Sequence, residues 1–178
     1  MEFESFEKIA RLNRGIVVTE KIDGTNGQIA FDEELKMYVG SRNQWITTAN
    51  DNFGFAAWAY ANEEELRGLG AGRHYGEWWG LGIQRRYGMG RKVFSLFNTG
   101  RWSSERPSCC GLVPLLYAGH YSENEITNCL NDLALNGSKA SPGFMNPEGV
   151  VVYHAAARKL FKVTIKNDEK PKGSNEEG

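Results

Sequence analysis

The sequence has few cysteines, few prolines and no long apolar run, and each shortage excludes a class of protein. There are 3 cysteines in 178 residues, and their spacing fits neither a disulfide framework nor a zinc site. The 5 prolines argue against stiff linkers, and no apolar stretch approaches the length that spans a membrane. The charged N-terminus lacks the apolar centre of a signal peptide. We therefore expect reduced thiols in a cytoplasmic protein without a membrane partner.

The chain also lacks an excess of either charge. Lysine and arginine number 21 against 22 acids, so a nucleic-acid partner would need a local basic patch. Hydrophobic residues at 40% support a packed core, and the 21 glycines favour tight turns. The length fits one domain, which we expect over residues 1–168, followed by a flexible tail over 169–178.

Local patterns predict the elements of an α+β fold. Residues 16–31 indicate a strand, a DGTNG turn and a returning strand. Further strands are predicted at 35–40, 73–80, 92–98, 113–119, 149–154 and 159–165, with the last two paired as a hairpin. Helical spacing predicts helices over 5–13, 51–67 and 122–135, the last capped by Ser122. Because strands occur in adjacent groups with helices between them, we expect largely antiparallel sheets with flanking helices.

Lys21 is the first candidate for chemistry. It stands near the end of a predicted buried strand, in EKIDG, before an Asp-Gly turn. A lysine nucleophile must lose a proton, which costs about 4.6 kcal/mol at pH 7 from an ordinary pKa of about 10.4. Nearby cations, a metal ion or desolvation would reduce that cost. The motif is short, and taken alone it is better explained by a surface lysine on an edge strand.

Two glutamates stand in apolar surroundings. Glu77 precedes two tryptophans, and a buried glutamate needs a partner such as a ribose hydroxyl or a metal ion. Glu148 enters an apolar strand and suits a hydrated magnesium ion, which prefers oxygen ligands. The alternatives are a water-facing glutamate at a strand edge and a residue that caps a strand entrance.

Basic residues form two further patterns. Lys162, Thr164 and Lys166 alternate along FKVTIKN, which places them on one sheet face, turned either to solvent or to a phosphate. Residues 84–106 combine six basic side chains, among them Arg85 and Arg86, with aromatic rings, as a nucleic-acid strand would require. A basic loop whose aromatic residues turn into the core is the alternative.

The order of these motifs resembles the covalent nucleotidyltransferase superfamily of ATP-dependent DNA ligases, RNA ligases and messenger-RNA capping enzymes. EKIDGTNG, SRN, GEWWGLGIQ, KVFSLFN, PEGVVV and FKVTIKN follow one another over residues 16–168. The TNG and GIQ segments look most like RNA ligases of the double-strand-sealing type and their small relatives without a C-terminal domain. The resemblance implies an ATP-grasp-like nucleotidyltransferase fold.

The resemblance also implies roles around a bound nucleotide. Lys21 would carry AMP through a phosphoramidate bond, and the backbone at Glu20 would contact adenine. Asp23 and Gly24 would shape the turn. Asn26 would lie near the phosphates or the incoming RNA end, Arg42 near the ribose or the acceptor phosphate, and Glu77 at the ribose. Phe97 would stack on adenine, with Phe94 as the alternative.

The remaining implied roles concern charge. Glu148 would help to hold Mg²⁺ or Mn²⁺, and Lys162 would contact the α-phosphate of ATP. The family has two lysines one residue apart here, whereas this sequence has Thr164 at the second position. The sequence therefore leaves open which of Lys162 and Lys166 contacts the phosphate. The chain stops about twelve residues after the last motif, which implies a minimal ligase, a ligase that relies on an accessory protein, or a protein limited to self-adenylylation.

The implied activity is an ATP-dependent RNA ligase that joins 5′-phosphate and 3′-hydroxyl ends, on a nicked duplex or an RNA/DNA hybrid. A capping-type guanylyltransferase shares the lysine chemistry but would use GTP. A DNA ligase and a non-catalytic nucleic-acid-binding module on the same fold are further alternatives. Self-labelling and joining assays separate these functions.

Overall fold

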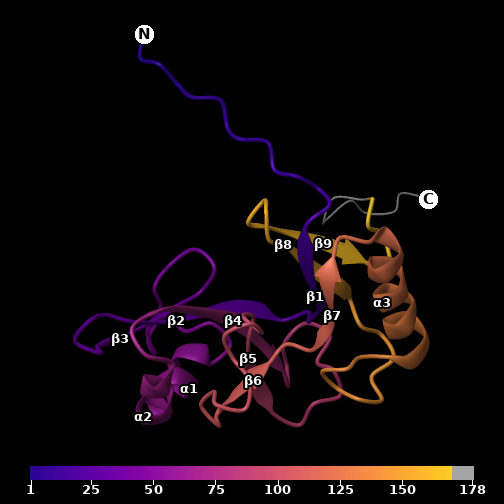
Figure 1. Ribbon diagram of the computed structural model, residues 1–178. Coiled ribbons are helices and arrows are strands. Elements are labelled where there is room, and N and C mark those ends of the chain that lie inside the picture. Colours follow the sequence, from indigo (N-terminus) through magenta and orange to yellow (C-terminus); the bar gives the residue numbers. More distant parts are fainter. Residues whose placement is uncertain (170–178) are drawn as a thin grey trace.

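The protein, described here by a computed structural model of residues 1–169, is built on two β-sheets (Figure 1). Sheet A has the strand order β7-β1-β8-β9 and is antiparallel throughout. It consists of β1 (Gly15–Lys21), β7 (Leu115–His120), β8 (Gly149–His154) and β9 (Lys159–Thr164). Sheet B has the order β3-β2-β4-β5-β6, and only its β5–β6 pair is parallel. It consists of β2 (Thr25–Phe31), β3 (Met37–Gly40), β4 (Gly72–Gly80), β5 (Lys92–Leu96) and β6 (Cys110–Leu112).

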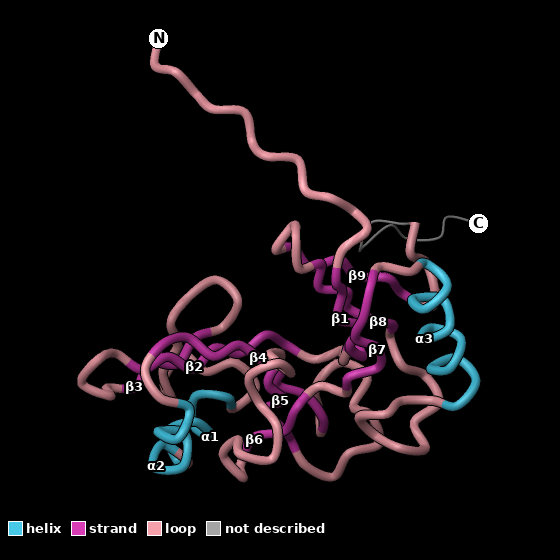
Figure 2. Tube along the Cα trace, in the orientation of Figure 1, coloured by secondary structure: helices cyan, strands magenta, loops and turns pink. Residues whose placement is uncertain are grey.

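Helices cover one face of each sheet (Figure 2). On sheet A this is α3 (Glu123–Asn136), which packs over β8 and β7. On sheet B these are α1 (Phe55–Ala61), α2 (Glu63–Leu66) and the 3₁₀ turn η1 (Arg67–Leu69). The predicted α+β architecture with largely antiparallel sheets is confirmed. No helix within residues 1–169 is long and apolar enough to cross a membrane.

The sequence explains where the helices begin and end. Ser122 caps α3 by accepting a hydrogen bond from the Glu125 N–H at 3.3 Å, as predicted. The single helix predicted over 51–67 is divided at Asn62, whose backbone leaves the helical region. Asp51 starts this region by accepting hydrogen bonds from the Ala56 and Ala57 N–H groups.

The helix predicted over residues 5–13 is wrong. The structure shows an extended segment that leaves the body of the protein (Figure 1). Phe6 and Ile9 are 89% and 82% exposed there. An isolated helix of this length is marginal in water, and its apolar stripe meets no surface that would stabilise it. The predicted tail, residues 169–178, lies outside the described residues except for Glu169.

The hairpin predicted over residues 16–31 is also wrong. β1 lies in sheet A and β2 in sheet B, so residues 22–24 cross between the sheets. Residues 113–114 make a second crossing, from β6 to β7. Ile22 and Val113 pack with Trp79 and Tyr87 in a small core at the crossings. The predicted turn therefore joins the two halves of the protein.

Candidate active site

The end of β1 holds a lysine against a carboxylate that is distant in the sequence. Lys21, the last residue of β1, pairs with Gly149, the first residue of β8. Glu148 precedes this glycine, and its Oε2 lies 2.7 Å from the Lys21 Nζ. The two side chains are 23% and 11% exposed. The amine is thus largely shielded from water and held beside an acid, unlike an ordinary surface lysine.

Glu77 lies across the crossing, in the middle of sheet B. Its Oε1 accepts a hydrogen bond from the Gly24 N–H at 3.0 Å, and its Oε2 accepts one from the Asn26 Nδ2 at 3.2 Å. Asn26 in turn accepts a hydrogen bond from the Arg42 Nε at 2.8 Å. β4 is flanked by β2 and β5, so Glu77 is not the water-facing edge residue of the alternative interpretation.

The surroundings of Glu77 change its acidity. Burial raises the pKa of Glu77 from its usual 4.5 to about 7. The Lys21 charge and the Gly24 N–H oppose this shift, whereas the Glu148 and Asp23 carboxylates add to it. A carboxyl group that titrates near neutral pH in a buried position is typical of functional sites.

Gly24 allows the crossing to approach β4 closely. A Cβ atom at this position would lie 2.5 Å from the Trp78 carbonyl oxygen and 2.7 Å from the Trp79 Cβ. Any larger residue would push the turn away from Glu77. The Asp-Gly pair of the motif therefore has a steric reason within this fold.

Arg85 connects the turn to the segment before Glu148. Its Nε donates to the Asp23 carboxylate at 2.9 Å, and its Nη1 donates to the carbonyls of Asn146 and Pro147. The guanidinium thus links sheet B to the entrance of β8. Nucleic-acid binding by Arg85 stays a prediction, and the geometry gives it a positioning task. Arg86, in contrast, is exposed.

The loop that carries Arg85 is strained. Gln84, Arg86 and Tyr87 all have positive φ angles, of 44°, 59° and 49°. Such angles are uncommon outside glycine and persist when the surroundings hold them. Here Tyr87 is buried, and its hydroxyl accepts a hydrogen bond from the Asp23 N–H at 2.8 Å. Tyr87, three residues after the GIQ segment, therefore supports the turn next to Lys21.

Glu20 has a second role that the sequence did not reveal. Its carboxylate is 1% exposed and accepts hydrogen bonds from the Ser138 Oγ and from the backbone N–H groups of Lys139 and Ala140. These partners stand 118 to 120 positions away, so no local pattern could show them. The contact of the Glu20 backbone with adenine stays a prediction.

The cationic strand is placed as the alternation predicts. Pairing through β8 puts Lys162 and Thr164 on the same face of sheet A as Lys21. Val163 and Ile165 face the α3 core on the other side. Lys166 lies beyond the end of β9, where it lines a cavity of about 290 Å³ together with Glu148 and Arg85. Both lysines are exposed.

The two phenylalanines considered for stacking lie on opposite faces of sheet B. Phe94 is fully buried against Phe55 and Trp58. Phe97 is 38% exposed and its N–H donates to the Tyr75 carbonyl, on the face that bears Glu77. Only Phe97 is placed to meet a ligand. Tyr87 and Trp102 turn inward, as the alternative for residues 84–106 expects.

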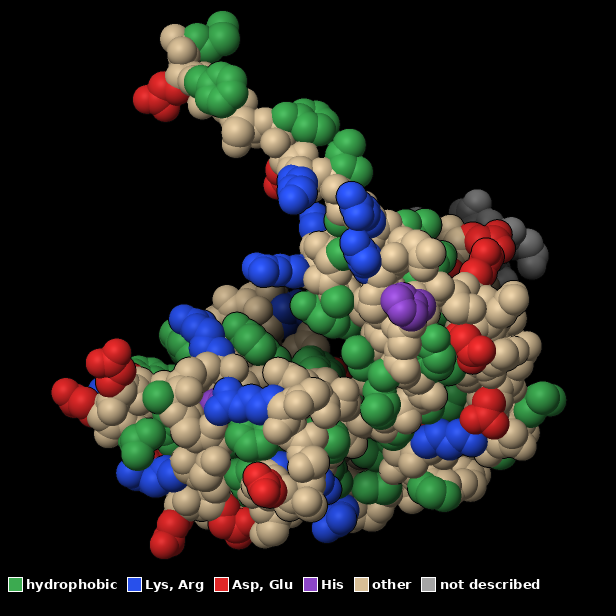
Figure 3. Space-filling model, viewed as in Figure 1, with side chains coloured by type: hydrophobic (Ala, Val, Ile, Leu, Met, Phe, Trp, Pro, Cys, Tyr) green, Lys and Arg blue, Asp and Glu red, His purple; other side chains and the backbone are tan. Residues whose placement is uncertain are grey.

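These groups border a hollow between the two sheets. Figure 3 shows the hollow with lysine and arginine side chains along its rims. Lys21, Glu148 and Lys162 come from sheet A, whereas Glu77, Asn26 and Phe97 come from or directly follow strands of sheet B. Two open sheet faces with an amine, two acids and a ring at their junction can hold a nucleotide.

Comparison with known proteins agrees with this arrangement. The family model described as RNA ligase matches residues 14–164. No curated protein matches the sequence. Among solved structures, a mutant of Naegleria gruberi RNA ligase with ATP and Mn has a TM-score of 0.64 at 19% identity, covering 85% of this chain and 49% of that one. A mutant of the same enzyme with AMP and Mn has a TM-score of 0.61 at 21% identity, covering 86% and 50%.

This chain thus spans about half the length of the structures that it matches. At such identity the structural likeness establishes the shared nucleotidyltransferase fold. The family match covers most of the chain, from the residue before β1 to the end of β9. The chain belongs to the RNA ligase family.

Proposed function

We propose that residues 1–168 form the adenylyltransferase domain of an ATP-dependent RNA ligase that joins a 5′-phosphate to a 3′-hydroxyl. The observation that carries this proposal is the Lys21 Nζ, held 2.7 Å from Glu148 at the junction of the two sheets. The complexes of the Naegleria gruberi RNA ligase with ATP and with AMP support the choice of nucleotide.

The first step would transfer AMP to the protein. The Lys21 Nζ, having lost a proton, attacks the α-phosphorus of ATP, and a nitrogen–phosphorus bond forms as the bond to pyrophosphate breaks. Glu148 accepts the Lys21 hydrogen bond in the resting site and so orients the amine. Lys162, on the same sheet face, would balance the phosphate charge.

The later steps would use the covalent AMP. A 5′-phosphate oxygen of RNA attacks the phosphorus and releases the Lys21 amine, which forms an RNA–adenylate. The 3′-hydroxyl of the other end, after losing its proton, then attacks the 5′-phosphate, and AMP leaves. The Asn26 and Arg42 side chains, joined by a hydrogen bond at 2.8 Å, would orient these ends.

The carboxylates fit a divalent cation. Mg²⁺ is usually held by one or two carboxylates together with substrate phosphates and water. Glu148 and Glu77 lie close enough to influence each other's charge, which suits this mode of binding. Bound Mg²⁺ or Mn²⁺ would neutralise phosphate charge, with Glu148 as the main protein ligand.

The proposal extends to the substrate and the compartment. A nicked RNA duplex or an RNA/DNA hybrid, with an accessory protein where more grip is needed, is the substrate that we expect. The three cysteines are free thiols, which supports a cytoplasmic location.

Self-labelling tests the proposal directly. The protein is incubated with ATP labelled at the α-phosphate and Mg²⁺, alongside a Lys21→Ala variant and a Lys8→Ala control on the exposed N-terminal segment. We expect label on the wild type and the control, and none on Lys21→Ala. Absence of label from the wild type, or equal label on the Lys21 variant, contradicts the proposal. Labelling from GTP instead indicates a capping-type enzyme, and sealing restricted to DNA nicks indicates a DNA ligase.

A further inference from the structure

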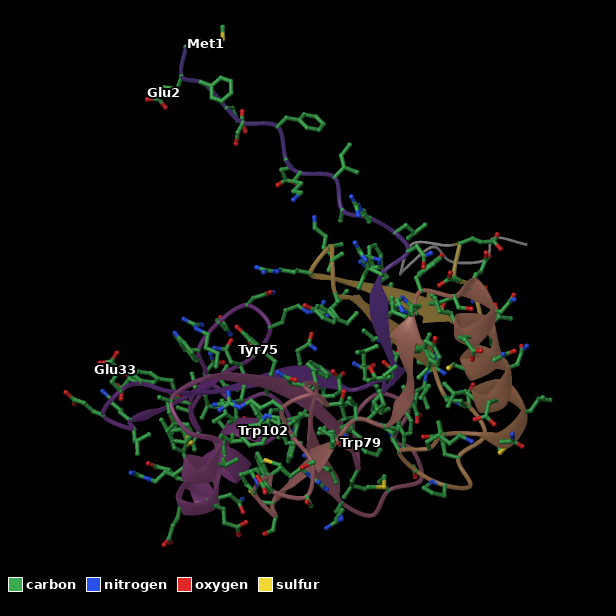
Figure 4. All side chains as sticks on the ribbon, viewed as in Figure 1. Met1, Glu2, Glu33, Tyr75, Trp79 and Trp102 are labelled. Atoms are coloured by element: carbon green, nitrogen blue, oxygen red, sulfur yellow. The ribbon has the colours of Figure 1, made fainter. Side chains whose placement is uncertain are left out.

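The open face of sheet B continues well beyond the candidate active site. Along β4 the buried Trp78 points to the helix-covered core, whereas Arg73, Tyr75 and Glu77 point to the opposite face. Tyr75 is 51% exposed although it stands in the middle of a sheet. Figure 4 shows Tyr75 on one side of the β4 ribbon and Trp102, which belongs to the core, on the other.

A second exposed ring lies on the same face. Gly40, Gln28 and Tyr75 stand opposite one another in the register of β3, β2 and β4. A Cβ atom at Gly40 would lie 3.1 Å from the Trp45 ring, so this ring covers the glycine. Trp45 is 48% exposed. With Phe97 beside Tyr75, three partly exposed rings form one row across the strands of this face, next to the row that holds Glu77.

The charges on this face are positive. The Arg73 guanidinium lies 5.5 Å from the centre of the Trp45 ring, and Arg42 stands at the end nearer to the active site. β2, β3 and β4 place no carboxylate on the face between Glu77 and Asp32. Asp32, at the outer end, already accepts the hydroxyl of Tyr38 and two backbone N–H groups.

The face also holds a hydrogen-bond donor without an acceptor. Within the described residues, the Gln28 Nε2 is buried and has no hydrogen-bond partner. An unsatisfied buried donor costs about 1–3 kcal/mol. This nitrogen has almost no accessible surface, so a ligand oxygen or ring nitrogen beside Tyr75 would recover the cost once the Gln28 side chain turns outward.

Rings, arginines and an unpaired donor, with no acid between Glu77 and Asp32, suit a single strand of nucleic acid. Unpaired bases stack on exposed aromatic rings, and arginines contact the phosphates. Neighbouring strands lie about 4.8 Å apart, so Phe97 and Tyr75 are one strand apart and Tyr75 is two strands from the Gly40 that Trp45 covers, a row that successive unpaired bases can follow. An apolar protein partner would not require Arg73. A continuous duplex would not use the exposed rings, because its bases are already stacked on one another.

We propose that Trp45, Tyr75, Arg73 and Gln28 form a binding face for RNA bases that are unpaired next to the nick, which leads an RNA end to Lys21. This inference rests on the proposed RNA ligase function. Trp45 and Tyr75 stack on bases, Arg73 contacts a phosphate, and Gln28 donates to a base or a ribose oxygen. The face is a binding surface and takes no part in the transfer of AMP to Lys21.

The test compares RNA binding with self-labelling in the same variants. Binding of a short fluorescein-labelled oligouridine is measured by fluorescence anisotropy for Trp45→Ala, Tyr75→Ala and Arg73→Gln. The loss of either ring should weaken binding about tenfold, because stacking contributes about 1–3 kcal/mol per base. Arg73→Gln should weaken binding and reduce its salt dependence by about one ion. Labelling by ATP should stay at the wild-type level.

Matched variants make the result specific. Tyr60→Ala and Arg67→Gln remove an exposed ring and an arginine from the helix-covered side, and they should bind oligouridine as the wild type does. Trp45→Phe and Tyr75→Phe keep a ring and should retain most of the affinity. Melting temperatures show that each variant is folded.

The outcomes distinguish the two proposals. Unchanged oligouridine binding by the Trp45 and Tyr75 alanine variants overturns the binding face, as does weaker binding to fully paired duplex alone. A change in oligomeric state without an effect on RNA overturns it in favour of a protein contact. If the wild type fails to label itself while the Trp45 and Tyr75 alanine variants bind RNA more weakly than it does, the ligase proposal fails and the binding face stands.

Discussion

The two sheets differ in how firmly they are packed. On sheet B, sixteen buried side chains form one core with several aromatic pairs, such as Phe55 with Trp78 and Phe94. The core of sheet A contains five buried side chains, and its edge strand β9 leaves Leu160 and Phe161 68% and 53% exposed. Sheet B therefore provides a firm platform, whereas the nucleophile and its cations belong to the more lightly packed half.

The chemistry is divided along the same line. In the proposed reaction, sheet B would supply groups that recognise a ligand by shape and hydrogen bonding, such as Phe97, Asn26 and Glu77. Sheet A would supply the Lys21 nucleophile and the Lys162 charge that faces a phosphate. Recognition gains from rigid support, because a displaced ring or carboxylate loses its partner. Three changes can break or sharpen this comparison.

The largest expected effect is on stability. Phe55→Ala, in the core of sheet B, should lower the free energy of unfolding by about 3–5 kcal/mol, because the cavity opens among three other rings. Phe161→Ala, the same change on β9, should change the free energy of unfolding by no more than about 0.5 kcal/mol, because the ring is exposed. Urea denaturation followed by tryptophan fluorescence measures both. Equal losses would show that the sheets are packed alike.

The second effect depends on pH. The folded-state pKa of Glu77 is raised from 4.5 to about 7, so the folded protein binds more protons than the unfolded chain in this interval. Stability therefore falls as the pH rises from about 4.5 to 7, by about 3 kcal/mol from this group. Glu77→Gln should remove this fall and melt at a higher temperature than the wild type above pH 7. Parallel pH profiles of the two proteins would disprove the titration.

The smallest expected effect concerns the link between the sheets. Arg85→Gln should lower the rate of self-labelling about tenfold, because Asp23 and the segment before Glu148 lose their common partner. Arg91→Gln, an exposed arginine of the same loop, is the control and should label normally. A labelling time course with ATP measures both. A normal rate for the Arg85 variant would mean that the ion pair with Asp23 does not position the turn.

Much of the fold could be predicted from local patterns. The Ser122 cap, the alternation on β9 and the apolar run of β8 each act over a few residues, and the structure confirms them. The predicted helix over 5–13 failed because its stripe needs a partner surface, which a sequence pattern does not show. The DGTNG turn failed as a hairpin because turn chemistry does not say which sheet the next strand joins.

The main residues of the site could be predicted, but several of their contacts could not. The order of motifs indicated Lys21, Glu77 and Glu148, and the structure brings all three to one junction. The buried partners of the Glu20 carboxylate and the place of Trp45 above Gly40 were missed, because both depend on segments that meet only in the folded chain. Long-range contacts of single side chains produce no periodic pattern in the sequence.

The two short crossings between the sheets limit how the protein can move. Residues 22–24 and 113–114 lie at the same small core, so a change in the angle between the sheets would bend the chain at this place. Lys21 stands next to this core and would move little, whereas the β2–β3 turn around Glu33, at the far end of sheet B, would move most (Figure 4). Under the proposed function, such a motion would widen the mouth of the hollow for an RNA end while the Lys21 nitrogen stays in place.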